Sequence, residues 1–86
     1  MTYRERMIAK LTAAFAPTLL EVIDDSEAHR GHAGAGALEE THFTVRIVSP
    51  AFAGTTRVAR HRMIHDAVRE ELAERVHALS IEADPS

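Results

Sequence analysis

The chain of 86 residues contains no cysteine. This absence excludes disulfide bonds, a zinc site with cysteine ligands and a cysteine nucleophile. If the chain binds a metal, histidine and carboxylate side chains must therefore supply the protein ligands. No apolar run approaches the length that spans a membrane, and the charged N-terminal sequence lacks the hydrophobic region of a signal peptide. We therefore expect a cytoplasmic protein.

Aromatic residues are also few, and the net charge is small. Three phenylalanines and one tyrosine leave the core mostly to aliphatic side chains. The formal net charge of −3 argues against a protein that coats nucleic acid, because such binding draws on clustered positive charge. A chain of this length buries only a modest core, so we expect a single domain over residues 1–86.

The spacing of apolar residues predicts the order helix, strand, strand, short helix, long helix, strand. Thr2-x-x-Glu5 matches a capping box at the start of the first helix, and Pro17 ends that helix. Ser49-Pro50 is typical of the N-cap and first position of a helix. The predicted helices are 2–16, 50–54 and 57–75, and the predicted strands are 18–24, 42–48 and 77–83.

Each predicted element has one apolar side. In the second strand, Phe43, Val45 and Ile47 alternate with polar residues, which is typical of a strand with one wet face. The apolar stripe of the long helix is Ile64, Val68 and Leu72, and its solvated side is predicted to hold Glu70, Glu71, Glu74 and Arg75. The helices should therefore pack on one face of a three-stranded sheet and leave the other face open, as an α+β fold.

Residues 25–41, DSEAHRGHAGAGALEET, interrupt this pattern with three glycines and two histidines, His29 and His32. Loops of this length are uncommon in small domains unless they have a function. The alternative interpretation is a solvated insertion that tolerates change.

The stretch VARHRMIHDAV places His61 between Arg60 and Arg62 near the start of the long helix. Such a histidine can be a metal ligand, a base, a phosphate contact or an ordinary surface residue. Neighbouring cations and the helix dipole disfavour imidazolium, so the neutral form that binds metals is favoured. With Arg57, the two arginines form a basic cluster. The cluster either docks a partner or nucleic acid, or is a solvated helix end.

The other histidines carry weaker signals. His65 lies four residues after His61, a spacing that can chelate a metal, but no third ligand is evident and we interpret it as a surface residue. His42 is expected on the open sheet face as a structural residue or partner contact. His77 is expected to pack at the sheet edge.

Five segments in order resemble the BolA family over almost the entire chain. They are AAFAP-TLLEVIDDS, THFTVRIVS, the F-x-G of Phe52 to Gly54, RHRMI and VHALSI. The resemblance implies a class II KH-like αββααβ fold, which agrees with the predicted element order. Nucleic-acid-binding KH domains clamp the backbone with a GXXG loop. The equivalent turn here, AFAGTTRV, has a single glycine, which weakens an RNA-binding interpretation.

The resemblance also implies a partnership. BolA-like proteins associate with monothiol glutaredoxins of the CGFS type and share a bridging [2Fe–2S] cluster, with glutathione as a further ligand. By resemblance, the chain would ligate iron through His61 and a loop histidine, His29, with His32 as the alternative. The implied role is an adaptor in iron–sulfur and iron homeostasis. Replacing two cysteine ligands by histidine raises the potential of such a cluster.

Two other functions remain open. Some BolA-like proteins are described as transcriptional regulators of stress response or cell morphology, with a helix-turn-helix-like segment that would here be PAFAG plus the long helix. Asp66, Glu70 and Glu71 on that helix would repel phosphates. No nucleophile–base pair or phosphate loop is evident, so we do not expect an enzyme. Alone, the chain is expected to be a monomer or a weak homodimer, because an exposed sheet edge can pair with a second copy.

Overall fold

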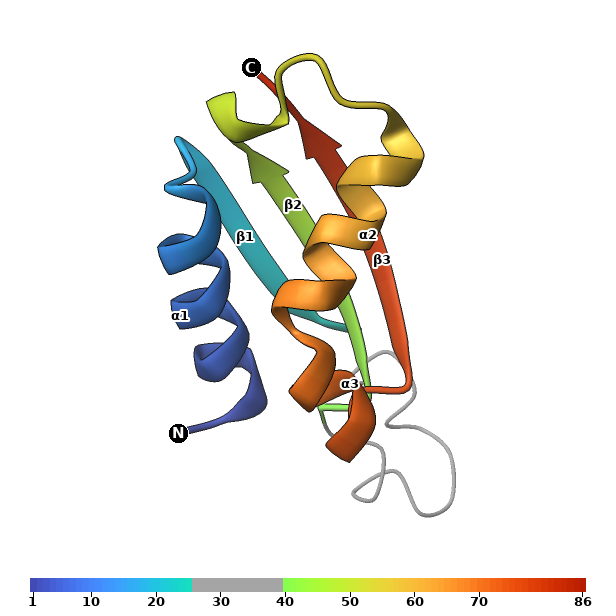
Figure 1. Ribbon diagram of the computed structural model, residues 1–86. Coiled ribbons are helices and arrows are strands. Elements are labelled where there is room, and N and C mark those ends of the chain that lie inside the picture. The colour runs from blue at the N-terminus through green and yellow to red at the C-terminus, as the bar shows by residue number, and fades with distance from the viewer. Residues whose placement is uncertain (26–39) are drawn as a thin grey trace.

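A computed structural model describes residues 1–25 and 40–86, and its elements follow the predicted order with one exception (Figure 1). The elements are α1 (Tyr3–Phe15), β1 (Leu19–Asp24), β2 (His42–Val48), η3 (Pro50–Phe52), α2 (Arg57–Ala67), α3 (Arg69–Glu74) and β3 (Ala78–Asp84). Among the helices in these two ranges, none is both long and apolar enough to cross a membrane.

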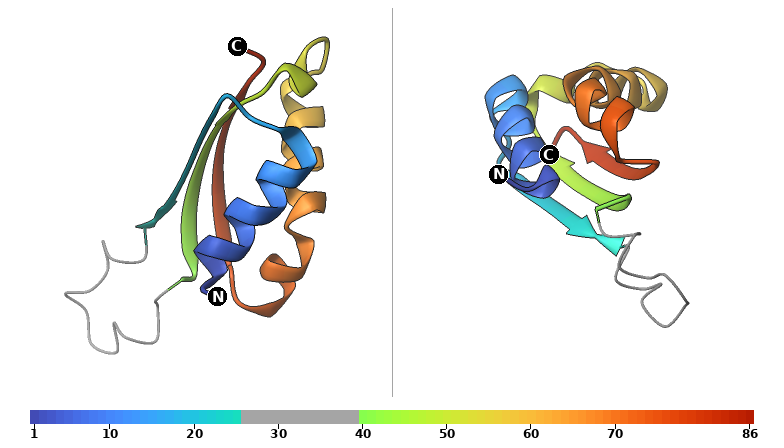
Figure 2. Two further views of the ribbon diagram at one scale, coloured as in Figure 1. Left: turned by 90° about the vertical axis from the view of Figure 1, so that its left-hand side faces the viewer. Right: turned by 90° about the horizontal axis from the view of Figure 1, so that it is seen from below.

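The sheet has the order β1-β2-β3, with β1 antiparallel and β3 parallel to β2. The helices of the described residues all lie on one face of this sheet, so the predicted α+β architecture is confirmed (Figure 2). The side chains of Phe43, Val45 and Ile47 on β2 are buried against the helices, as their alternation predicts. Met7 and Leu11 of α1 meet them from the helical layer.

The N-terminus of α1 has the predicted capping box. The Thr2 hydroxyl accepts a hydrogen bond from the Glu5 N–H, and the Glu5 carboxylate accepts one from the Thr2 N–H, each at 3.0 Å. These hydrogen bonds to Thr2 hold the pKa of Glu5 below its usual value. At the other end, Ala16 adopts a left-handed conformation (φ 44°) immediately before Pro17, which ends the helix.

The predicted helix 57–75 is wrong in one respect, because it is two helices with a break at Val68. Val68 has φ −113° and ψ 24°, outside helical values, although its N–H still donates to the Ile64 carbonyl at 3.2 Å. The β-branched side chain of Val68 is fully buried at the break. The short helix α3 that follows packs against α1, and this contact involves charged side chains.

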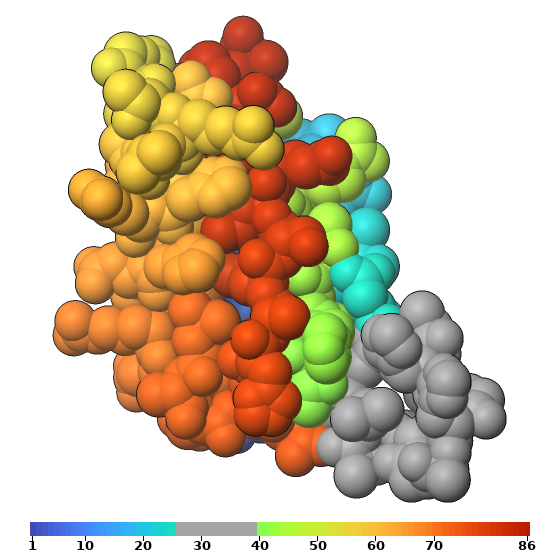
Figure 3. Space-filling view, turned by 90° about the vertical axis from the view of Figure 1, so that its right-hand side faces the viewer, coloured from blue at the N-terminus to red at the C-terminus, as the bar shows by residue number. Residues whose placement is uncertain are grey.

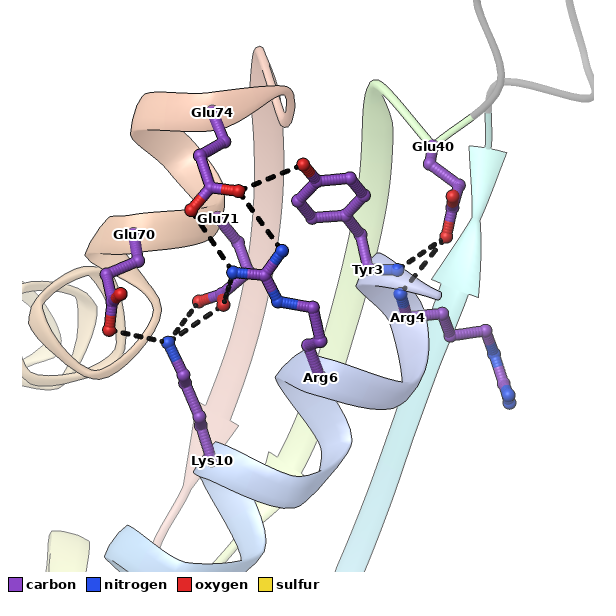
Figure 4. A network of polar contacts seen from close by, with 8 residues as sticks. All are labelled: Tyr3, Arg4, Arg6, Lys10, Glu40, Glu70, Glu71 and Glu74. Carbon is purple, nitrogen blue, oxygen red and sulfur yellow. Dashed lines mark hydrogen bonds and ion pairs between the residues drawn. The ribbon is translucent and has the colours of Figure 1, made fainter. Parts of the chain in front are cut away.

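Glu71 was predicted to face solvent, and this prediction is wrong: its side chain has 0% exposure. The Lys10 Nζ lies 3.0 Å from one carboxylate oxygen of Glu71 and 2.8 Å from the other (Figure 4). A guanidinium nitrogen of Arg6 lies 3.0 Å from the second of these oxygens. Burying a carboxylate is possible here because two cations from α1 compensate its charge. Glu71 falls seven residues after the buried Ile64, and this spacing places both on the same helical face. The burial of Glu71 was therefore predictable from the sequence.

The pair of Glu74 and Arg6 makes stability depend on pH. Arg6 donates two hydrogen bonds to the Glu74 carboxylate, at 3.1 and 3.2 Å, and this contact holds the pKa of Glu74 below its usual value. A lowered pKa gives stability that is present above the unfolded pKa and lost as pH falls through the folded one. Between pH 7 and pH 3, we therefore expect the urea midpoint of Glu74→Gln to fall less than that of the wild type. Equal falls in the two proteins would contradict this prediction.

Candidate functional site

The residues on either side of the segment 26–39 contact each other, and one of them also contacts α1. The Glu40 N–H donates to the Asp24 carboxylate at 3.3 Å. The Glu40 carboxylate in turn accepts hydrogen bonds from the N–H groups of Tyr3, at 2.7 Å, and Arg4, at 3.3 Å (Figure 4). A carboxylate on these first N–H groups is favourable because they have no partner within the helix. His29 and His32 lie between these two anchors, outside the described residues.

His61 lies in the second turn of α2. Thr56 caps this helix by accepting a hydrogen bond from the Ala59 N–H at 3.1 Å. The His61 side chain is half-buried, and its ring makes no hydrogen bond or ion pair with any residue that the structure describes. Both ring nitrogens are therefore uncommitted within this part of the chain.

A pocket of about 460 Å³ opens beside His61, between the start of α2 and the C-terminal end of β3. Arg57, Arg60 and His61 line it from α2, and Ile81 to Asp84 line it from β3. The remaining lining residues belong to the other two strands: Leu19, Arg46, Ile47 and Val48. The pocket therefore reaches from the helical side of the sheet around to residues of its open face.

Arg60 differs from the other two arginines of the predicted basic cluster. Its guanidinium donates to the Thr55 hydroxyl at 3.0 Å, to the Thr55 carbonyl at 3.1 Å and to the Ala83 carbonyl at 3.0 Å. Its side chain is only 18% exposed. Arg60 thus joins the turn before α2 to the end of β3 and fixes one wall of the pocket. It lies four residues before the buried Ile64, on the same helical face, which explains its burial.

Arg57 and Arg62 are exposed and uncompensated. Of the arginines that the structure describes, these two alone have no hydrogen-bond acceptor or acid in contact with their side chains. They flank His61 along α2, so the surface around this histidine carries free positive charge. A role for Arg57, Arg60 or Arg62 in partner or nucleic-acid contact stays a prediction.

Two of the remaining histidines lie as expected and one does not. His65 is exposed, and the ring of His42 lies 2.9 Å from the Thr41 hydroxyl. His77 is exposed and precedes β3, which begins at Ala78, so the prediction that it packs at the sheet edge is wrong. Within residues 1–25 and 40–86, no three histidine or carboxylate side chains are grouped so that they could hold a metal ion.

The open sheet face carries a row of ion pairs beside the pocket. Arg46 of β2 lies opposite Glu21 of β1 and Glu82 of β3 in the strand register. Its guanidinium is 3.0 Å from each carboxylate. These exposed pairs contribute little stability individually, but they hold the Arg46 side chain across the three strands at the pocket wall.

Comparison with known proteins agrees with this fold and sequence pattern. The family model described as BolA-like protein matches residues 11–86. The chain belongs to the BolA family. The predicted resemblance is therefore confirmed, and the fold is that of BolA proteins.

Several known proteins resemble the chain over most of its length. A Sinorhizobium protein named "Uncharacterized protein in cobS 5'region" is 49% identical over 83 residues, covering 95% of this chain and 89% of that protein. The "DNA-binding transcriptional regulator BolA" of Escherichia coli K12 is 47% identical over 81 residues, covering 94% and 73%. The solved structure of BolA1 from Arabidopsis thaliana has a TM-score of 0.84 at 39% identity, covering 98% and 92%.

Proposed function

We propose that this BolA-family chain is a non-enzymatic cytoplasmic adaptor that binds a monothiol glutaredoxin and shares a bridging [2Fe–2S] cluster with it. His61 would be one ligand, and a histidine of the segment 26–39 the other, His29 or alternatively His32. The observation that carries the proposal is the uncommitted ring of His61 at the wall of an open pocket.

The chemistry of this position suits a shared cluster. Iron binds a neutral imidazole through a nitrogen that carries no proton. A histidine whose ring is held by no described residue can offer that nitrogen without breaking an existing contact. The described residues supply no complete ligand set around His61. The other ligands would therefore come from the segment 26–39, the partner and glutathione. A cluster with histidine ligands has a higher potential than one with four thiolates.

The His61→Ala variant tests the proposal. Mixed with a CGFS-type glutaredoxin, glutathione, iron and sulfide, the wild-type chain should form a heterodimer with an altered visible spectrum. The variant should lose the spectral change or need roughly 10–100-fold more protein to reach it, since losing even an outer-shell partner of a metal ligand costs this much. His65→Ala, one turn along α2, is the matched control. His29→Ala and His32→Ala distinguish the two loop candidates. A variant without His61 that keeps the wild-type spectrum would show that the ligand assignment is wrong.

DNA binding is the second candidate, and the free charge of Arg57 and Arg62 supports it. The Escherichia coli relative bears the name of a DNA-binding transcriptional regulator. Exposed arginines without acidic neighbours can contact phosphates, whereas Arg60 has its donors engaged. The exposed acidic residues Asp66 and Glu70 lie on the following turns and weaken this interpretation.

Salt dependence distinguishes this second candidate. Binding that uses two phosphate contacts should follow a slope of about −1.8 for log K against log salt, since each contact contributes about −0.9. Removing Arg57 or Arg62 should make the slope less steep by about 0.9, the share of one contact. Arg69→Ala should leave the slope unchanged. Fluorescence anisotropy with promoter DNA at several salt concentrations measures this. An anisotropy that does not rise as the protein is added at low salt excludes the DNA-binding function.

A further inference from the structure

Among the residues that the structure describes, none pairs with the outer edge of β3 along most of its length. Among the described strands, β3 pairs only with β2, and the Ala78 N–H donates to the Thr41 carbonyl at 3.1 Å on that side. The backbone groups of successive strand residues point alternately to the two edges. Leu79, Ile81 and Ala83 therefore direct their N–H and C=O groups away from β2. Figure 3 shows β3 uncovered between α2 and β2.

The free groups are concentrated at Leu79 and Ile81. Within the described part of the chain, neither residue makes a hydrogen bond on the outer edge, while the Ala83 carbonyl accepts from Arg60 at 3.0 Å. The opposite edge of the sheet differs, because the Val22 carbonyl of β1 accepts from Arg4 at 2.7 Å. An unpaired edge is a template on which an extended segment can add as a further strand.

The surface beside this edge carries apolar, basic and acidic side chains. Each of its two acids lies near an arginine, Glu82 at 3.0 Å from Arg46 and Asp84 at 3.9 Å from Arg60. The pocket brings Ile81 and Ala83 of the edge together with Arg57 and His61 of α2. Val58 precedes His61 by three residues, so both lie on one side of the helix, and Val58 is 58% exposed. A strand added here would meet one free cation and one uncommitted imidazole.

We propose that an extended segment of the partner protein pairs with the free edge of β3 and places an acidic side chain against Arg57, next to His61. Charge complementarity selects the acidic side chain, since Arg57 lacks any acid among the described residues. The outer-edge N–H and C=O groups of Leu79 and Ile81 form the backbone hydrogen bonds of this pairing. The identity of the partner rests on the proposed function. This docking mode places the metal-binding face of the partner beside His61, the candidate metal ligand.

Amide exchange in the iron-free complex tests the docking mode. The ¹⁵N-labelled chain is measured by NMR alone and with unlabelled reduced monothiol glutaredoxin. The amides of Leu79 and Ile81 should exchange at least tenfold more slowly in the complex. Ser80 and Glu82, whose amides face β2 in both states, are internal controls with unchanged rates. Slowing that follows the concentration of the free chain alone would assign the edge to a second copy and overturn the proposal.

Charge reversal tests the acidic contact. Arg57→Glu should weaken the iron-free complex at least tenfold by calorimetry, and Arg69→Glu, at an exposed position of α3, should leave it unchanged. Equal affinity of the Arg57 variant and the wild type would overturn the acidic contact. A complex that forms with unchanged exchange at Leu79 and Ile81 overturns the docking mode and leaves the proposed function standing. Failure to form any complex, both without iron and with iron, sulfide and glutathione present, overturns both.

Discussion

The Arg6→Met, Lys10→Met double variant is expected to lose a large part of its stability. These two side chains are the cations that contact the carboxylate of Glu71, which has no exposed surface. Stripping a buried charge of its partners costs about 3–5 kcal/mol. Native domains are stable by only about 5–15 kcal/mol, so urea denaturation should show a midpoint far below that of the wild type. Methionine keeps the apolar part of each side chain in place.

A third substitution separates charge from packing. Adding Glu71→Leu to the double variant removes the unpaired carboxylate and fills the site with an apolar side chain of similar size. Replacing a buried ion pair by packed apolar residues is often neutral or stabilising, so the triple variant should recover most of the lost stability. Should the triple variant remain as unstable as the double, the charge of Glu71 is not the cause of the loss.

Phe52→Ala is expected to be the most damaging truncation in the core, at about 3–5 kcal/mol. The Phe52 ring is fully buried, and its centroid lies 5.0 Å from that of Phe15 at the end of α1. The Phe52 carbonyl also accepts the Thr55 N–H at 3.1 Å, and Thr55 in turn holds Arg60 at the start of α2. The substitution therefore leaves a cavity beneath the segment that positions His61.

Phe52→Leu is the matched control, with an expected loss of less than about 1.5 kcal/mol because it keeps most of the buried volume. Thermal unfolding followed by circular dichroism measures both variants. Amide exchange at Thr55 and Arg60 should rise in the alanine variant before global unfolding. An alanine variant that melts with the leucine variant would show that the surrounding structure collapses onto the cavity.

Most of the fold and part of the site follow from the sequence. The alternation of Phe43, Val45 and Ile47 placed β2 at its observed bounds, and the capping box of Thr2 and Glu5 placed the start of α1. These features are local, because a strand or helix period and a cap are set by residues within a few positions of each other. The same local pattern singled out His61 and its flanking arginines.

The tertiary structure decided the partners of the charged residues. Glu71 and Arg60 are hydrophilic by type, but their helical positions face the interior, and their compensating groups come from α1 and β3. Lys10 and Glu71 are 61 positions apart in the chain, so no local period pairs them. Likewise, Arg57, Arg60 and Arg62 are the same residue type within one helix, and the contacts of Arg60 with Thr55 and Ala83 distinguish it from the other two, which have no acceptor among the described residues. Local spacing thus determined which elements form. Long-range packing determined which charged side chains are paired within the fold and which remain available to a partner.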